Sequence, residues 1–256
     1  MTELTEPHPQ GAPAWVDMMT GDRAGAAEFY GGLFGWDFEQ VEAGRTRALV
    51  RGKPVAGFTG VPDDSLLPVV WTTYFATDDL DDTLALLVAH GGTQLGPAFD
   101  AGADGRGALA VDPTGAAFGL WEAGTHIGAH VVREPGAVWW NELATRDAAG
   151  AVEFYRAVLG LEPDPAPGSG YQRLSLDGHV VAGVFSMDDA VPEGIPAHWM
   201  AYFTVPDADV AATRARELGG VVVHPVVEVP FGRFTTLGDP SGATFRIIQP
   251  PPSPRG

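Results

Sequence analysis

The sequence predicts an α+β protein built from two tandem copies of one domain, each copy holding two β-α-β-β-β modules. A strand, a turn at an aspartate and a helix occupy Trp15–Gly35, and the same unit returns at Trp140–Gly160. Later segments repeat in the same order at an offset of 125 to 128 residues. A single period maintained over such a length indicates tandem duplication.

The opening strand of each copy ends at an aspartate, Asp22 in the first and Asp147 in the second. An aspartate is a good helix N-cap because its carboxylate accepts hydrogen bonds from free backbone N–H groups. Apolar residues then follow at helical spacing up to a glycine, Gly35 or Gly160, which suits a left-handed C-cap. These signals predict one helix between each aspartate and its glycine.

The rest of the first half has the pattern of strands with one further helix. Turn residues separate three strands, at 36–41, 45–50 and 55–60. A linker at 61–68 leads to a second strand–helix unit, which ends at Gly91-Gly92. Three more strands run to Trp121, and the last two are joined by a turn at Asp112–Gly115.

The second half repeats these segments in order. Trp199–Phe203 corresponds to Trp71–Phe75, and the turn Asp239–Gly242 corresponds to Asp112–Gly115. We therefore expect the following division of the chain: a disordered tail at 1–12, a first domain at 13–122, a linker at 123–137, a second domain at 138–249 and a Pro-rich tail at 250–256.

The charge and the composition of the chain exclude several kinds of partner and chemistry. The net charge of −18 argues against binding to nucleic acid or to anionic membrane surfaces, because a protein needs a basic face to bind either. The chain has no cysteine, which excludes disulfides, thiolate ligands and a cysteine nucleophile. No apolar run approaches the roughly 20 residues of a membrane span. We expect a cytoplasmic protein, a monomer or homodimer, with no nucleic-acid or membrane partner.

The chain from about Pro13 to Gln249 resembles the vicinal oxygen chelate superfamily, the group of glyoxalase I, bleomycin-resistance proteins and extradiol dioxygenases. Within it, the chain is similar to the tandem-domain branch labelled glyoxalase-like or hydroxylase. The resemblance rests on the Gly-Gly helix stop, the two Asp-Pro-x-Gly turns and the strand–helix signature, whose residues are Asp22, Phe29, Tyr30, Gly35, Asp147, Phe154, Tyr155 and Gly160. It implies that paired modules curl into eight-stranded, cup-shaped barrels with the site inside. Whether modules pair within a half, or the first with the fourth, stays open.

Enzymes of this superfamily usually hold a divalent metal in the cup, with ligands on the first and last strands of a module. The matching first-strand positions here are Trp15, Thr72, Trp140 and Met200, and the last-strand positions are Gly57, Gly119, Gly183 and Arg246. Threonine is a poor ligand, and the other side chains do not bind zinc or iron. We therefore expect no metal and no other cofactor, which argues against glyoxalase I and extradiol dioxygenase activity.

Alternate residues of a strand face the same side, so Asp17 shares the face of Trp15 and Glu142 that of Trp140. The glycines at the ligand positions would leave room in the cups. A flat apolar ligand would suit such a site, held by stacking and a few polar contacts. The residues predicted to bind it are Trp15, Thr72, Tyr74, Trp140, Met200, Tyr202 and Arg246.

Several of these residues have a second, structural interpretation. Trp15 and Trp140 either stack on the ligand or plug the cups. Asp17 and Glu142 either act as acid and base, with Tyr202 or Tyr74 as hydrogen-bond donor, or serve as hydrogen-bonded structural groups. Arg246 either clamps an acidic ligand or pairs with Glu142.

The sequence also predicts where three further features lie. Trp139 is predicted to lie in the core under a helix, because it faces away from Trp140. His198 is predicted at the rim of the second cup, and Phe231–Phe234 forms either a flap or a simple hairpin. The second half, with Glu142, Arg246 and His198, holds the more usable chemistry.

We thus predict a metal-independent protein that binds a small aromatic or hydrophobic metabolite in its cups, with a sequestration or resistance role. The alternative is a metal-free enzyme of lyase, isomerase or hydroxylase type, with Glu142, Asp17 and Tyr202 as its catalytic residues. A metal-dependent lyase or dioxygenase with unusual ligands is the third interpretation.

Overall fold

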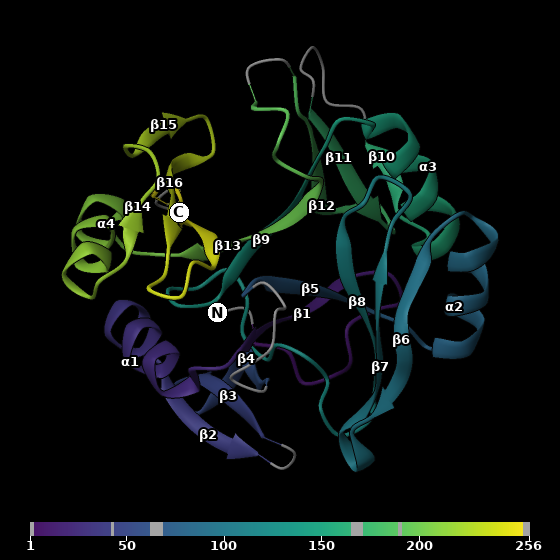
Figure 1. Ribbon diagram of the computed structural model, residues 1–256, viewed down its shortest axis with the longest axis horizontal. Coiled ribbons are helices and arrows are strands. Elements are labelled where there is room, and N and C mark those ends of the chain that lie inside the picture. The colour runs from purple at the N-terminus through teal and green to yellow at the C-terminus, as the bar shows by residue number, and fades with distance from the viewer. Residues whose placement is uncertain (1–2, 42–43, 62–68, 165–170, 189–190, 253–256) are drawn as a thin grey trace.

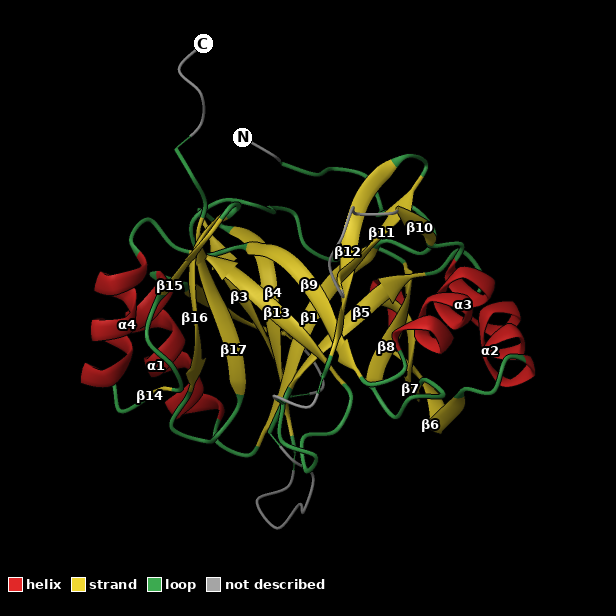
Figure 2. Cartoon of the chain, turned by 90° about the horizontal axis from the view of Figure 1, so that it is seen from above, coloured by secondary structure: helices red, strands yellow, loops and turns green. Residues whose placement is uncertain are grey.

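The computed structural model describes residues 3–41, 44–61, 69–164, 171–188 and 191–252. Two curved sheets form the middle of the molecule, and four helices pack in two pairs at its outer ends (Figures 1 and 2). The helices are α1 (Arg23–Phe34), α2 (Leu80–Ala89), α3 (Ala148–Leu159) and α4 (Ala208–Glu217), and a short 3-10 helix spans Gly102–Asp104. The linker predicted at 61–68 lies almost wholly outside the described residues.

The first sheet has eight strands in the order β2-β3-β4-β1-β5-β8-β7-β6. They are β1 (Pro13–Thr20), β2 (Asp37–Val41), β3 (Arg45–Val50), β4 (Lys53–Gly60), β5 (Trp71–Ala76), β6 (Thr93–Asp100), β7 (Gly105–Val111) and β8 (Ala117–Ala123). This sheet therefore joins the first module to the second.

The second sheet repeats this order as β10-β11-β12-β9-β13-β17-β16-β14, and β15 pairs with β16 as an addition. Its strands are β9 (Val138–Thr145), β10 (Glu162–Asp164), β11 (Tyr171–Leu176), β12 (His179–Ser186), β13 (His198–Thr204), β14 (Val221–Val222), β15 (Val227–Val229), β16 (Gly232–Gly238) and β17 (Thr244–Gln249). The predicted α+β fold of four modules is confirmed. Each sheet is an open cup rather than a closed barrel, because its end strands do not pair with each other in the described residues.

The helix caps form as their residues predict. The Asp22 carboxylate accepts a hydrogen bond from the backbone N–H of Gly25 at 2.8 Å, and Asp147 accepts one from Gly150 at 2.9 Å. Gly35 ends α1 with a φ of 71°, and Gly160 ends α3 with a φ of 70°. Only glycine adopts this left-handed conformation at little cost, so each helix stops where the sequence places one.

The hydrophobic cores follow a different pairing from the sheets. One core joins the first module to the fourth and contains Phe29, Phe58, Phe203 and Phe245; the other joins the second module to the third and contains Phe75, Phe118, Phe154 and Leu159. Accordingly α1 lies beside α4, and α2 beside α3 (Figure 1). The cups form within a half, whereas the two large cores form between halves, so neither half buries most of its apolar surface alone.

The Phe-Tyr pair of each signature helix lies in one of these two cores. The Tyr30 hydroxyl donates to Asp239 of the opposite half at 3.1 Å and accepts from the indole N–H of Trp71 at 2.9 Å. In the same way Tyr155 donates to Asp112 at 2.9 Å and accepts from Trp199 at 2.8 Å. The Asp-Pro-x-Gly turns thus supply the buried acceptor that a buried tyrosine needs.

The N-terminal segment differs from the prediction of a disordered tail over 1–12. Residues 3–12 lie against the chain between the domains, where the Leu4 amide donates to the carbonyl oxygen of His130 at 2.8 Å. Glu3 forms an ion pair with Lys53 at 2.6 Å and a β-bridge with Val131. These polar contacts explain the difference, because a segment with few apolar residues is held by hydrogen bonds that its composition does not reveal. Of the Pro-rich tail, residues 253–256 lie outside the described residues.

Among the described residues, no helix combines the length and the apolar character needed to cross a membrane.

Candidate functional site

The first cup contains a cavity of about 380 Å³. Trp15, Asp17 and Met19 of β1 all line it, as the alternation of β1 predicts. The remaining walls come from both modules, and their aromatic members are Tyr74, Phe99 and Trp121. Aromatic and aliphatic side chains form most of its walls, Asp17 is the one carboxyl group that β1 supplies, and the other charged residues that line it are Arg45, Arg47, Asp100 and Asp104.

The carboxyl group on β1, that of Asp17, belongs to a residue that is 8% exposed. Burial raises the pKa of Asp17 to about 6, against the opposing influence of Thr59, Arg45 and Trp15. Its Oδ1 atom has no hydrogen-bond partner among the residues that the structure describes. Asp17 is thus a buried acid whose charge is only partly compensated, and it changes protonation near neutral pH.

The glycines at the predicted ligand positions do not leave open room, which corrects that expectation. A Cβ atom at Gly57 would lie 2.4 Å from Asp17 Oδ2, and one at Gly119 would lie 2.1 Å from the ring of Tyr74. In the second cup, a Cβ at Gly183 would lie 2.0 Å from the Tyr171 hydroxyl. Side chains from neighbouring strands fill each space, so the glycines position those side chains.

His126 also lines the cavity, although the sequence placed it in the linker at 123–137. Its ring meets that of Trp15 edge-on at 4.6 Å, and its carbonyl oxygen accepts from the indole N–H of Trp121 at 2.8 Å. Desolvation lowers the pKa of His126 to about 3, so the ring is neutral at physiological pH. A single histidine in a glycine-bearing linker carries no sequence signal, which explains why it was missed.

The second cup is organised around Glu142, which accepts hydrogen bonds from Arg246 at 2.5 Å and from the Tyr202 hydroxyl at 3.0 Å. Arg246 also contacts the Tyr202 hydroxyl and lies over the Tyr202 ring, 5.0 Å from its centroid. Its Nε donates to Thr236 at 3.2 Å. The structure therefore shows the ion-pair alternative for Arg246, and Glu142 is engaged by the protein itself.

Trp140 is tied to the same cup, because its indole N–H donates to the Tyr171 hydroxyl at 2.8 Å. Tyr171 in turn hydrogen-bonds Glu142, and burial raises the pKa of Tyr171 well above its usual value. Thr72 and Met200 are both buried on the central strands, opposite Asp17 and Glu142 respectively.

Trp139 does not lie under a helix, so that prediction is wrong. The register of β9 against β13 shifts between Trp140 and Val138, which makes Trp139 the extra residue of a β-bulge. A bulge redirects the side chain, and the Trp139 ring stacks on Phe231 with centroids 6.0 Å apart. Phe231 stands between β15 and β16, so the predicted flap-or-hairpin segment is a hairpin whose tip touches Trp139.

Two histidines of the second half form hydrogen bonds of their own. His198, at the start of β13, hydrogen-bonds the carbonyl oxygen of Pro196 through Nδ1 at 2.9 Å. His224 lies in the loop between β14 and β15, and its Nε2 lies 3.0 Å from the Thr236 hydroxyl, the group that also accepts from Arg246.

The residues present do not fit a metal ion. The matched ligand positions hold the side chains named above, and the register confirms their equivalence because Tyr74 pairs with Gly119 as Tyr202 pairs with Arg246. Across the described ranges, no three or more histidine, cysteine, aspartate or glutamate side chains gather as a metal would require. Arg246 places a cation where the family carries a ligand. The expectation that the protein binds no metal stays a prediction.

Comparison with known families gives two matches. Residues 12–120 match the model described as the Glyoxalase/Bleomycin resistance protein/Dioxygenase superfamily, and residues 140–248 match a Glyoxalase-like domain.

Two groups of relatives cover nearly the whole chain. "Putative glyoxylase CFP32" of Mycobacterium tuberculosis is 41% identical over 254 residues, which cover 95% of this chain and 96% of that protein. "Anthracycline biosynthesis protein DauV" of Streptomyces sp. (strain C5) is 36% identical over 256 residues, covering 93% of each chain.

Among solved structures, the Mn(II)-bound glyoxalase from Novosphingobium aromaticivorans matches with a TM-score of 0.67 at 16% identity, over 94% of this chain and 82% of that one. The 2,3-dioxygenase LapB from Pseudomonas sp. KL28 matches with a TM-score of 0.62 at 17% identity, over 95% of both chains. At these identities the likeness concerns the fold alone.

Proposed function

The chain belongs to the glyoxalase, bleomycin resistance protein and dioxygenase superfamily, and we propose that it binds a small aromatic or hydrophobic molecule in its first cup. The observation that carries this proposal is the cavity of about 380 Å³ with walls from Trp15, Tyr74, Phe99 and Trp121. Its volume falls within the range of about 300–1,000 Å³ that is usual for small-molecule sites. Flat aromatic walls favour a flat ligand.

The ligand's polar end would meet Asp17, the one carboxyl group of β1 in the cavity. Above a pH of about 6 this group is ionised and accepts hydrogen bonds, so a phenolic hydroxyl is a suitable partner. The name of the relative DauV associates that protein with anthracycline biosynthesis. Anthracyclines are flat fused-ring molecules, which supports an aromatic ligand here.

The second cup is the weaker candidate for the same role. Glu142, Tyr202 and Arg246 bind one another in its centre, so a ligand would have to displace these contacts. Breaking a buried ion pair in this way is costly. We therefore assign ligand binding to Trp15, Asp17 and Tyr74 rather than to their equivalents in the second half.

The proposal is tested first by native mass spectrometry of protein purified from its host, which would reveal a co-purified small molecule. A defined probe then locates the site: 2-naphthol, an uncharged two-ring phenol, titrated by calorimetry. Phe99→Ala should weaken its binding about tenfold, since one aromatic wall is lost. The matched control is Phe231→Ala, because Phe231 is similarly exposed (45% against 36%) but lies outside the cavity. Equal effects of the two substitutions would contradict the assignment.

A second candidate function rests on the acidity of Asp17. A buried acid with a pKa of about 6 is suited to proton transfer near neutral pH, so a metal-free enzyme acting on the bound molecule is the rival proposal. Turnover of the co-purified molecule that is lost in Asp17→Asn, with binding retained, would favour the enzyme. Binding without turnover in the unmodified protein would favour sequestration.

A further inference from the structure

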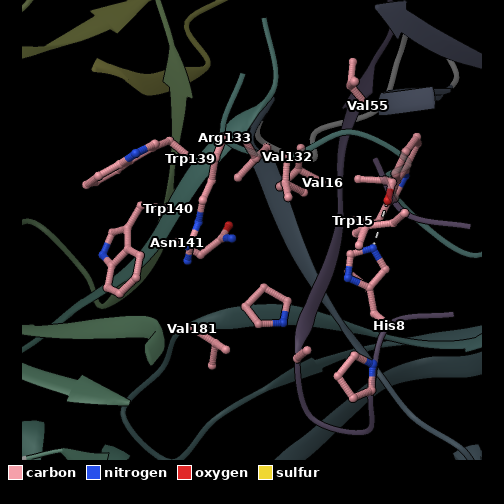
Figure 3. A pocket seen from close by; sticks show the side chains of 17 residues that line it. His8, Trp15, Val16, Val55, Val132, Arg133, Trp139, Trp140, Asn141 and Val181 are labelled. Atoms are coloured by element: carbon pink, nitrogen blue, oxygen red, sulfur yellow. Dashed lines mark hydrogen bonds between the residues drawn. The ribbon is translucent and has the colours of Figure 1, made fainter. Parts of the chain in front are cut away.

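A second cavity, of about 280 Å³, lies in a groove between the two halves, outside both cups (Figure 3). We call it the interdomain groove. Strands β1 and β4 line it from one half and β9 and β12 from the other, while residues 4–14 and 129–133 contribute the rest. Its position between the halves means that no single domain of this fold contains it.

The two halves contribute equivalent residues to the groove. Trp15 and Trp140 both line it, as do Val55 and Val181, which also correspond to each other in the repeat. The indole N–H of Trp140 is used inside the second cup by Tyr171, and Trp15 hydrogen-bonds Asp17 in the first. The tryptophans therefore present ring carbons to the groove, which gives it flat apolar walls.

The β-bulge adds a third indole on one side. Trp139 lines the groove together with Trp140, and their ring centroids lie 6.1 Å apart. The equivalent residue of the first half is Ala14, which also lines the groove but fills little of it. The aromatic surface is thus concentrated on the side of β9, and the smaller residue opposite leaves space for a flat ring.

Two polar side chains, those of Asn141 and Arg133, line the groove. The Asn141 side chain lines the groove although the residue is only 5% exposed; its Oδ1 accepts from Thr73 at 3.0 Å, but its amide nitrogen has no hydrogen bond to any described residue. The guanidinium of Arg133 likewise forms no hydrogen bond or ion pair within the described ranges. Figure 3 shows Arg133 and Asn141 next to each other beside Trp140.

This combination points to an anion. The Asn141 amide nitrogen has no hydrogen bond to a described residue and is not sealed from solvent, so it can donate to a group in the groove. The Arg133 guanidinium is exposed beside it and has no partner in the described residues, so it too can donate to a ligand. Guanidinium and amide N–H groups together match the two oxygens of a carboxylate.

The far end of the groove carries an acceptor. His8 donates from Nε2 to the carbonyl oxygen of Ala129 at 3.0 Å, which leaves Nδ1 unprotonated. Desolvation lowers the pKa of His8, so the ring stays neutral. Among the described residues that line the groove, Arg133 is therefore the one cation available to an anion, which fixes the direction in which a ligand would lie.

We propose that the interdomain groove is a second binding site, for a flat aromatic carboxylate whose ring stacks on Trp139 and Trp140 and whose carboxylate binds Arg133 and Asn141. This site is separate from the first cup and takes a different class of ligand. Trp15 stands between them, because it lines both cavities.

The experiment is a calorimetric titration of the full chain with 2-naphthoate and, separately, with its uncharged methyl ester. Arg133→Gln should weaken 2-naphthoate binding about tenfold or more, because a charge-assisted hydrogen bond is lost, and should leave the ester unchanged. Arg133 is exposed, so the substitution should not disturb folding. Arg216→Gln, at an exposed arginine of α4, is the matched control and should have no effect.

Three results would overturn the proposal. The first is that the unmodified protein does not bind 2-naphthoate. The second is that Arg133→Gln and Arg216→Gln weaken binding equally, which would indicate a general effect of net charge. The third is that Phe99→Ala abolishes 2-naphthoate binding while Arg133→Gln does not, which would place the carboxylate in the first cup.

Discussion

The two cups share one backbone and differ at one decisive position. In both, the central strands place a tryptophan opposite a tyrosine and a carboxylate two residues further on. The last strand then carries Gly119 in the first cup and Arg246 in the second, at the same register. Arg246 engages Glu142, whereas at Gly119 the ring of Tyr74 takes the space and no cation stands on that strand beside Asp17.

The difference teaches how a duplicated site diverges. In the second cup a carboxylate, a tyrosine and an arginine satisfy one another, which fills the centre. In the first cup the charge that influences Asp17 is that of Arg45, on β3. Tyr171 occupies the equivalent place in the second half. The first cup has its cation, Arg45, on an outer strand, and the second cup has its cation, Arg246, on the last strand. Asp17 is therefore incompletely paired beside an open cavity.

The largest effect should come from breaking the pair that fills the second cup. Arg246→Met removes the partner of Glu142, whose side chain is only 7% exposed, and should cost about 3–5 kcal/mol of unfolding free energy. Urea denaturation measures this change. The control is Arg233→Met, which breaks an exposed pair with Asp209 and should cost less than about 1 kcal/mol. Similar values for both variants would mean that the second cup is not held by this pair.

The next prediction concerns the first cup, where substituting the carboxylate should raise the free energy of unfolding instead of lowering it. The pKa of Asp17 is raised from 3.8 to about 6 in the folded protein, so the unfolded chain loses this proton at a lower pH than the folded one. Stability therefore falls as the pH rises from about 4 to above 6, and the ionised group costs up to about 3 kcal/mol at pH 8. Asp17→Asn should recover part of this free energy at pH 8 and none of it below pH 4.

Denaturation of the two proteins across this pH range gives the measurement, and Glu142→Gln provides the comparison from the second cup. Because Glu142 is paired with Arg246, its substitution should destabilise the protein at pH 8. If Asp17→Asn also destabilises at pH 8, the first carboxylate is as well compensated as the second, and the contrast between the cups fails.

Much of this contrast could be predicted from the sequence. The repeat aligned Asp17 with Glu142 and Gly119 with Arg246, because duplication preserves strand order and strands alternate their faces. Pairing of Arg246 with Glu142 was one of two stated alternatives. The residues that line the cups could be named because the repeat matches their positions, and a single sequence is enough to show that repeat.

Other features depend on geometry that residue types do not encode. A β-bulge adds one residue to one strand, so the strict alternation that placed Trp139 in the core fails at that residue. Side chains from adjacent strands occupy the space at Gly57 and Gly119. The presence of a glycine in the sequence does not show that a neighbour fills the space beside it. His126 reaches the first cavity because the linker folds back, and the interdomain groove exists only once the halves are assembled.

The smallest predicted effects separate the two tryptophans, which the sequence left as either stacking residues or plugs. Trp15 borders the open cavity of the first cup, so Trp15→Ala should weaken 2-naphthol binding by on the order of 1–3 kcal/mol, by analogy with stacking of bases on aromatic side chains. Trp140 instead supports Tyr171 beside the paired Glu142. Trp140→Ala should lower the melting temperature through a cavity and an unpaired hydroxyl, with 2-naphthol affinity nearly unchanged. Calorimetry and thermal unfolding of both variants decide the matter: if Trp15→Ala alters only the melting temperature, Trp15 is a plug and the first cup is not the binding site.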